Sequence, residues 1–227
     1  MVAAGLLLVG LAGPARADRR NFAYTYDWFT PGQNEKEIEF YWTQERGGEV
    51  DAQLEFEYGI TDRYLAAPYL LLKREHGDHW EVEGFKLEQR YRLGNYKQRR
   101  LLPALYFEVA KESGESWEVE GKLITTYVTG RNLWSFNLIG EQHLEDGEPF
   151  EWGYSTGLSH LITGEHNAKA SWVGFETFGS FTEKEYSIGP VAGHAFDQQN
   201  RLILTGALGL NDRSSTQVRL LFEHEWY

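Results

Sequence analysis

Val50-Asp51-Ala52-Gln53-Leu54-Glu55-Phe56-Glu57-Tyr58 alternates apolar and polar residues without a break. Successive side chains of a β-strand point to opposite faces, so this segment predicts a strand with one apolar and one acidic face. Less regular versions of the pattern recur down to Trp226-Tyr227, and short turns such as Gly59-Ile60-Thr61-Asp62 separate them. Long two-faced strands joined by tight turns favour a closed barrel whose apolar face points into lipid. The predicted fold class is therefore all-β, a closed antiparallel up-and-down transmembrane β-barrel with short loops.

We predict about twelve strands, most of them near or above the 9–11 residues that a tilted strand needs to cross a bilayer. The connections between them contain Gly, Asn and Asp, which tolerate the backbone conformations of tight turns. The predicted strands are Glu35–Glu45, Glu49–Gly59, Arg63–Arg74, Trp80–Leu93, Leu101–Lys111, Trp117–Thr129, Asn132–Leu144, Phe150–Leu161, Asn167–Phe178, Lys184–Phe196, Arg201–Leu210 and Thr216–Tyr227.

One hairpin is repeated along the chain. Residues 63–84 align without a gap with residues 100–121, and the repeated segment Trp-Glu-Val-Glu-Gly ends at Gly84 in the first copy. In that copy the apolar positions shift parity, from Trp80 and Val82 to Phe85 and Leu87. A β-bulge inserts one extra residue into a strand and produces this shift, so we predict a bulge at Gly84.

The N-terminus has the pattern of an export signal. An apolar run over residues 2–13 is followed by Ala15-Arg16-Ala17, a small-x-small site ahead of Asp18. This pattern predicts a signal peptide, residues 1–17, cleaved near Ala17. The run is shorter than the roughly 20 apolar residues of a membrane-spanning helix. The remaining chain is predicted to comprise an N-terminal periplasmic arm, residues 18–34, and the transmembrane barrel, residues 35–227.

The segment Asn21–Gln33 allows two interpretations. Its aromatic residues alternate as in a strand, and Thr30-Pro31-Gly32-Gln33 follows as a turn; the aromatic residues are Phe22, Tyr24, Tyr26 and Trp28. The segment is either a short extra strand or an arm tucked into the mouth of the barrel, and it is left out of the count of twelve.

Composition narrows the functional classes. The chain has 227 residues, no cysteine and a net charge of −12, which excludes disulfides and thiolate metal sites and argues against nucleic acid as a partner. Its hydrophobic fraction of 41% and mean hydropathy of −0.51 suit a barrel whose inner face is polar. Aromatic residues make up 15% of the chain, as expected for girdles at the membrane interfaces.

Several motifs resemble a known class of protein. Phe22-Ala23-Tyr24-Thr25-Tyr26, Pro31-Gly32 and Glu37-Ile38-Glu39-Phe40-Tyr41-Trp42-Thr43 resemble the N-terminal region of uncharacterised bacterial outer-membrane barrels. Glu57-Tyr58-Gly59-Ile60-Thr61-Asp62-Arg63 is similar to their periplasmic strand-to-turn motif. Similar turns occur in barrels assigned to the MetA pathway of phenol degradation and in other outer-membrane transporter barrels. The resemblance implies a multi-pass barrel in the bacterial outer membrane, with its lipids and the barrel-insertion machinery as partners.

Strand parity assigns the side chains to the two faces of the barrel. We expect Val50, Leu54, Phe56, Leu105, Phe107, Leu123, Trp152, Leu204 and Leu220 to contact lipid. The candidates for lining the lumen are Glu37, Glu39, Glu55, Glu57, Lys86, Glu88, Arg90, Arg92, Glu108, Glu120, Lys122, Arg219 and Glu223. The same parity adds Asp51, Lys73, Glu118, Glu141, Glu151, Lys169, Glu185, Arg201 and Glu225, and it also points Tyr41, Tyr69 and Tyr106 inward.

No catalytic or metal site is predicted. Ser159 and His160 are adjacent on one strand and therefore point to opposite faces, and His194 has no evident serine partner. The loop Glu75-His76-Gly77-Asp78-His79 gathers metal-capable side chains, but a polar loop alone rarely holds ligands in metal geometry. We expect a solvated loop there, and neither an enzyme nor a cofactor.

The acidic lumen predicts a narrow channel or transporter for small cationic or neutral solutes. An alternative is a closed structural barrel without conduction, filled by salt bridges and water. A further alternative is a secreted soluble β-barrel that binds a ligand, for which strands of this length and number are unusual.

Overall fold

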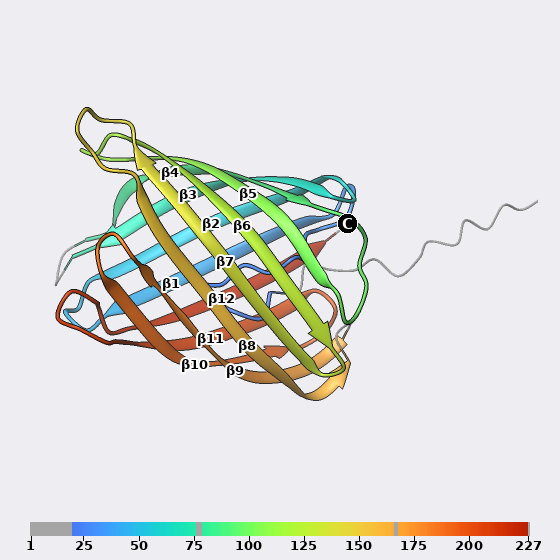
Figure 1. The fold of residues 1–227 in the computed structure, drawn as a ribbon. Helices are drawn as coiled ribbons and strands as arrows, with labels where there is room; N and C mark the ends of the chain where they lie inside the picture. Colours follow the sequence, from blue (N-terminus) through green and yellow to red (C-terminus); the bar gives the residue numbers. More distant parts are fainter. Residues whose placement is uncertain (1–19, 76–78, 166–167, 227) are drawn as a thin grey trace, which may run out of the picture.

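The computed structural model describes residues 20–75, 79–165 and 168–226, and it is a closed barrel of twelve antiparallel strands (Figure 1). Each strand pairs with the next along the chain, and β1 pairs with β12 to close the barrel. The strands are β1 (Lys36–Glu45), β2 (Val50–Thr61), β3 (Tyr64–Arg74), β4 (Glu81–Arg92), β5 (Leu101–Glu112), β6 (Trp117–Thr129), β7 (Asn132–His143), β8 (Glu151–Glu165), β9 (Ala168–Ser180), β10 (Glu185–Ala195), β11 (Asn200–Gly209) and β12 (Gln217–Trp226). The predicted fold class and strand number are confirmed.

The strand ends agree with the predicted ends to within two residues, with one exception. β8 continues to Glu165 instead of ending at Leu161. Its pairing with β9 is irregular on both sides of Thr163, and Gly164 has a φ of +76°. The ladder therefore continues through a distorted segment that lacks the regular alternation on which the prediction depended.

Closure satisfies the backbone at both edges of the sheet. The pairing of β1 with β12 runs without a break from Lys36 opposite Trp226 to Glu45 opposite Gln217. A barrel closed in this way leaves no row of unpaired N–H and C=O groups, which is the condition for placing strands in lipid. No helix in the described part of the chain is long and apolar enough to cross a membrane.

The outer face carries the apolar side chains. Those predicted to contact lipid are exposed at Leu54, Phe56, Leu105, Phe107, Leu123, Trp152 and Leu204, and Leu220 is half-buried. The prediction for Val50 is wrong, because this residue is only 1% exposed. Val50 pairs with Gln44 on β1 and with Arg74 on β3, and both of these neighbours carry longer side chains than Val50.

The inward assignment of Lys169 is also wrong. Lys169 is exposed, whereas Ala170 and Trp172, of the opposite parity, are buried. Lys169 follows the irregular end of β8 and has a φ of +30°, so regular alternation begins only after it.

The predicted bulge in β4 is confirmed. Leu71 pairs with Gly84 but Leu72 pairs with Val82, so Glu83 is the extra residue. A Cβ on Gly84 would lie 2.2 Å from the carbonyl oxygen of Lys111, which explains why glycine stands at this position. The bulge returns the apolar side chains that follow it to the outer face.

The two ends of the barrel differ. β1 begins and β12 ends at one end, which we call the terminus side; the short turn between β2 and β3 lies there too. The other end, which we call the far side, carries the connections from β1 to β2, from β5 to β6 and from β7 to β8. Figure 1 shows the terminus side on the right and the far side on the left.

The facing of the strands predicts unequal tolerance to charge. Leu105→Arg places a cation on the lipid face and should lower the free energy of unfolding by roughly 2–4 kcal/mol if the site lies near the bilayer midplane. Gln53→Arg, which changes a side chain lining a solvent-accessible cavity, should cost much less. Urea titration of both variants in lipid vesicles measures the difference. Equal costs would contradict the assignment of faces.

Candidate functional site: the barrel lumen

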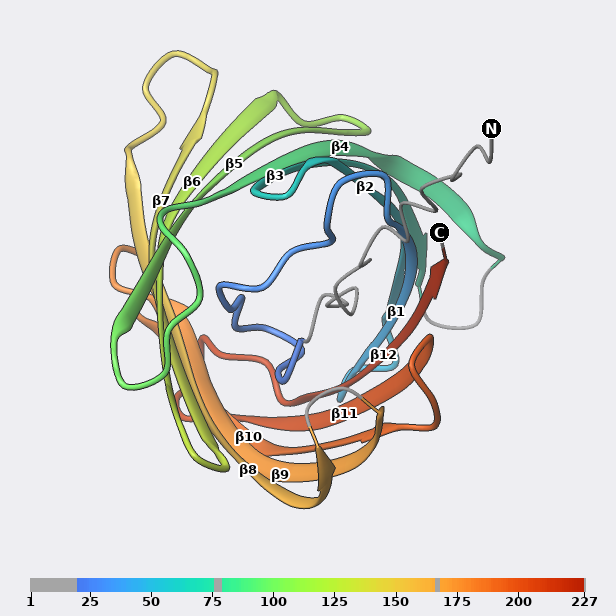
Figure 2. The same ribbon diagram turned by 90° about the vertical axis from the view of Figure 1, so that its right-hand side faces the viewer.

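The lumen contains the N-terminal part of the described chain. Figure 2 looks into the barrel from the terminus side and shows this segment, Arg20–Asn34, crossing the interior; we call it the arm. The arm forms no strand, and nearly all of its residues up to Thr30 are buried. The aromatic alternation that resembles a strand therefore belongs to an irregular segment enclosed by the wall.

Glu176 on β9 holds the first half of the arm. Its carboxylate accepts hydrogen bonds from three successive backbone N–H groups, those of Ala23 (3.2 Å), Tyr24 (3.0 Å) and Thr25 (3.1 Å). Glu176 is completely buried. A buried carboxylate needs such donors, and the arm needs an acceptor for them, so each stabilises the other.

Neutral side chains of β6 and β7 bind the next residues of the arm. The N–H of Tyr26 donates to Asn137 Oδ1 (2.8 Å), and the carbonyl of Tyr26 accepts from Asn137 Nδ2 (2.9 Å) and Ser135 Oγ (2.7 Å). The N–H of Trp28 donates to Thr126 Oγ1 (2.9 Å). The wall thus replaces the backbone partners that a strand would have supplied.

Cationic side chains of the lumen lie over the aromatic rings of the arm. Such contacts are attractive within about 6 Å of the ring centre. The distances to the ring centres are 4.0 Å for Arg219 and Tyr24, 4.3 Å for Arg20 and Tyr26, 4.4 Å for Lys122 and Tyr26, and 4.7 Å for Arg92 and Trp28. Three of the predicted lumen candidates, Lys122, Arg92 and Arg219, therefore contact the arm.

Glycines of the wall make room for the arm. A Cβ on Gly157 would lie 2.5 Å from the ring of Phe22, and a Cβ on Gly59 would lie 1.9 Å from the carbonyl oxygen of Gly32. Gly157 on β8 faces the arm deep in the lumen, and Gly59 on β2 faces it where the arm turns into β1. The wall is shaped to the arm at both places.

The acidic residues of β1, β2 and β4 are enclosed with two arginines. Arg90 lies between Glu57 and Glu88, with its Nε 2.6 Å from Glu88 Oε1, and Arg20 of the arm lies 2.7 Å from Glu39. The candidates Glu37, Glu39, Glu55, Glu57, Glu88, Arg90, Glu108 and Glu223 are all at most 3% exposed. Most of the acidic lumen predicted from parity is thus packed between wall and arm.

Tyrosine hydroxyls satisfy the carboxylates further. Glu88 accepts from Tyr69 (2.5 Å) and Tyr26 (3.2 Å), Glu55 accepts from Tyr41 (2.9 Å), and Glu108 accepts from Tyr106 (2.7 Å). The three tyrosines predicted to point inward are buried, and all three also line the cavity described next.

A cavity of about 360 Å³ lies on the far side of the arm; we call it the vestibule. The candidates Lys86, Glu108, Glu120, Lys122 and Arg219 line it, together with Glu118, Glu141 and Glu151 at the far-side ends of β6, β7 and β8. Arg20, Tyr24 and Tyr26 of the arm form part of its boundary. Beside Arg20 and Asn21, at the terminus side, lies a second cavity of about 20 Å³, which is room for about one water.

Sequence reasoning missed the residues that bind the arm, namely Glu176, Asn137, Ser135 and Thr126. It also missed a serine partner for His194, because Ser171 Oγ lies 2.8 Å from His194 Nδ1. His194 is exposed and Ser171 is half-buried on the outer face, and the His194 ring packs edge-on against Phe196. Of the loop considered for metal binding, residues 76–78 lie outside the described residues, as does the predicted signal peptide.

Comparisons with known proteins report on the fold. No family model matches the chain, and no curated protein matches it. Among solved structures, the KdgM porin in complex with disordered oligogalacturonate has a TM-score of 0.65 at 10% identity, covering 84% of this chain and 99% of that chain. The COG4313 outer membrane channel from Pseudomonas putida F1 has a TM-score of 0.65 at 9% identity, covering 88% and 98%.

The chain has the fold of outer-membrane channel barrels. The NanC porin, with a TM-score of 0.55 at 6% identity, is a further structure of this kind. The resemblance to outer-membrane barrels seen in the sequence is therefore confirmed at the level of fold. At these identities the likeness does not extend to the side chains of the lumen.

The contacts of the arm predict how it can be released. Because the chain has no cysteine, Thr25→Cys provides a single reporter at a site with no exposed surface. Maleimide labelling of this reporter should be slow, and adding Glu176→Ala should accelerate it several-fold, since three arm N–H groups lose their acceptor. Asp146→Cys, in an exposed far-side loop, should label rapidly in both backgrounds. Unchanged labelling of Thr25→Cys would show that Glu176 does not hold the arm.

Proposed function

We propose that this protein is an outer-membrane channel for small neutral or cationic solutes, and that the structure is its closed form. The observation that carries this proposal is the vestibule, which lies at the far side of the lumen and ends on the arm. The terminus side would face the periplasm, as the resemblance of the turn between β2 and β3 implies. Conduction then requires the arm to move.

The charges around the vestibule favour neutral or cationic solutes weakly. Five carboxylates and four cationic side chains line it: Glu108, Glu118, Glu120, Glu141 and Glu151, with Arg20, Lys86, Lys122 and Arg219. Lys86 and Lys122 are already paired, with Glu108 (3.2 Å) and Glu120 (2.8 Å). The buried glutamates deeper in the lumen are covered by the arm, so they act on a solute only once it has moved.

The lining also suggests a class of solute. Tyr24, Tyr41, Tyr69, Tyr106 and Tyr154 give the vestibule several aromatic surfaces with polar edges. Such a lining suits small polar or aromatic molecules. This solute class agrees with the resemblance of the turn motifs to those of barrels assigned to the MetA pathway of phenol degradation. The oligogalacturonate of the KdgM complex is a polyanion, whereas the vestibule of this chain carries one more carboxylate than cationic side chains and so does not favour a polyanion.

A closed structural barrel is the second candidate. The observation that favours it is the number of contacts between arm and wall, which include Glu176, Asn137 and the buried pair of Arg20 with Glu39. If these contacts never open, the arm is a permanent part of the interior and the barrel conducts nothing.

Planar-bilayer recording separates the two candidates. Wild-type barrels should show little steady conductance, and the double variant Glu176→Ala/Asn137→Ala should conduct at least several-fold more, because the arm loses most of its backbone partners. Gels run before and after boiling check that both proteins are folded barrels. A variant in which Thr25→Cys labels rapidly but no current flows would leave the structural barrel as the better account.

Ion preference tests the charge argument. In the conducting variant K⁺ should pass more readily than Cl⁻, and Glu120→Gln/Glu151→Gln should reduce this preference. The reduction should be larger at low salt, where screening is weak. Reversal potentials across a KCl gradient give the measurement. Preference for Cl⁻ before the glutamates are neutralised would contradict the proposed solute class.

A further inference from the structure

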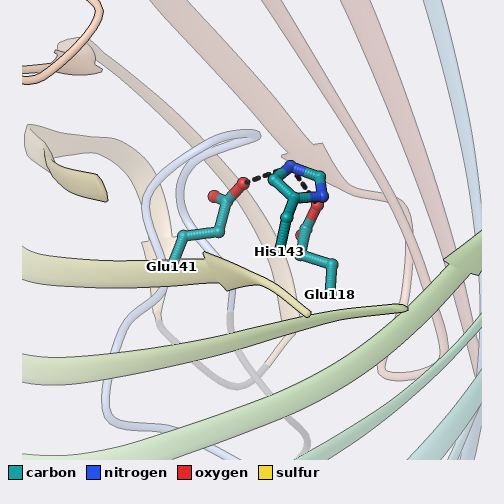
Figure 3. Close-up of side chains that lie close together, drawn as sticks. All are labelled: Glu118, Glu141 and His143. Atoms are coloured by element: carbon teal, nitrogen blue, oxygen red, sulfur yellow. Dashed lines mark ion pairs between the residues drawn. The ribbon is translucent and has the colours of Figure 1, made fainter. Parts of the chain in front are cut away.

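Three side chains meet at the far-side end of β6 and β7. Figure 3 shows Glu118, Glu141 and His143 pointing toward one another. Glu118 on β6 is the direct ladder partner of His143 on β7, and Glu141 precedes His143 by two residues and so shares its face. Glu118 and Glu141 line the vestibule, and the three side chains are between 24% and 29% exposed.

Their spacing fits a metal ion. His143 Nε2 lies 3.4 Å from Glu118 Oε2 and 3.9 Å from Glu141 Oε1, and one ligand atom of each residue lies within 4.8 Å of the others. Ligands about 2.0–2.1 Å from a tetrahedral Zn²⁺ are about 3.3 Å apart. The separations in the structure approach this value, so small side-chain rotations would bring all three ligands to a common ion.

The charge of the surroundings favours a cation. Glu151 on β8 is the ladder partner of Glu141, so a third carboxylate stands beside the other two. Like charges on adjacent strands destabilise a sheet unless something compensates them. The neighbouring lysines, Lys86 and Lys122, are engaged with Glu108 and Glu120. Among the described residues, Glu118 and Glu141 each form an ion pair with His143. The imidazole of a histidine that binds a metal is neutral, so in the metal-bound state His143 would not compensate the charge of these carboxylates.

We propose that Glu118, Glu141 and His143 form a binding site for a divalent transition-metal ion such as Zn²⁺. An imidazole nitrogen with two carboxylates suits Zn²⁺ and similar ions better than Mg²⁺ or Ca²⁺, which prefer oxygen alone. All three ligands lie on paired strands, which fixes their backbones. The vestibule leaves a further position open for water or for a donor atom of a solute. This site does not depend on whether the barrel conducts.

Calorimetric titration of folded barrels in detergent with ZnCl₂ at neutral pH tests the proposal. The wild type should bind one Zn²⁺ per barrel. His143→Asn and Glu118→Gln should each weaken binding by at least about tenfold, because the loss of a residue that only hydrogen-bonds to a metal ligand already weakens binding by about that much. His160→Asn is the matched control, because His160 is exposed on the outer face and paired with Asn132. It should leave binding unchanged.

Two further readouts separate a built site from nonspecific attraction. Co²⁺ in place of Zn²⁺ should give visible absorption bands in the wild type that are absent from His143→Asn. Excess Ca²⁺ should not displace Zn²⁺. If a correctly folded wild type did not bind Zn²⁺ stoichiometrically, the proposal would be overturned. Equal affinity in His143→Asn, or ready displacement by Ca²⁺, would also overturn it, because these would indicate only attraction to an acidic wall.

Discussion

A polypeptide segment enclosed in a barrel has no ladder to join, so its backbone depends on side chains of the wall. The N–H groups of residues 23–26 and of Trp28 find their acceptors on Glu176, Asn137 and Thr126. Each such group left buried without a partner would cost about 1–3 kcal/mol. The choice of polar side chains at these positions of β6, β7 and β9 therefore depends on the arm as much as on the barrel. Because these side chains hold the arm across the lumen, the arm separates the vestibule from the small cavity at the terminus side.

The charges bind the arm to the opposite wall in the same way. Arg20 of the arm is the ion-pair partner of Glu39 on β1, and Arg90 on β4 donates to the carbonyl of Phe29 while pairing with Glu57. Breaking a buried pair by removing one partner leaves an uncompensated buried charge, which is strongly destabilising. Water entering in place of the arm would solvate those carboxylates instead. In the proposed open form, the residues that hold the arm would thus become the wetted lining of the lumen.

The barrel could be predicted from the sequence because lipid imposes a local pattern. β2 alternates without a break, and the parity shift at Gly84 revealed a bulge, since each is visible within a few residues. The arm follows no such rule, and its aromatic alternation from Phe22 to Trp28 resembles a strand. Its partners are distant in the chain, as Tyr26 and Asn137 are, so no local signal records them.

The inward position of Glu176 was not predicted, for a related reason. Its strand, β9, turns Trp172 inward as well, and this buried aromatic residue weakens the contrast between the two faces. One signal was available in the neighbouring strands. The inward positions of β7 and β8 carry small residues, Ser135, Ser155, Gly157 and Ser159, which cannot fill a lumen by themselves. Such a run indicates that another part of the molecule occupies the space, and the aromatic arm is that part.

Different physical constraints determine the residues of the outer face and those of the lumen. Lipid and closure determine the outer face, which explains how channels with about 10% identity share the fold over most of their length. The lumen is not bound by that constraint, and function in shared folds resides in sites of this kind. Here Glu118, Glu141 and Glu151 lie at the far-side ends of β6, β7 and β8, whereas Arg20 belongs to the arm and Arg219 lies over Tyr24 of the arm. In the channel proposed above, a solute in the vestibule would contact both these carboxylates and the four cationic side chains that line it.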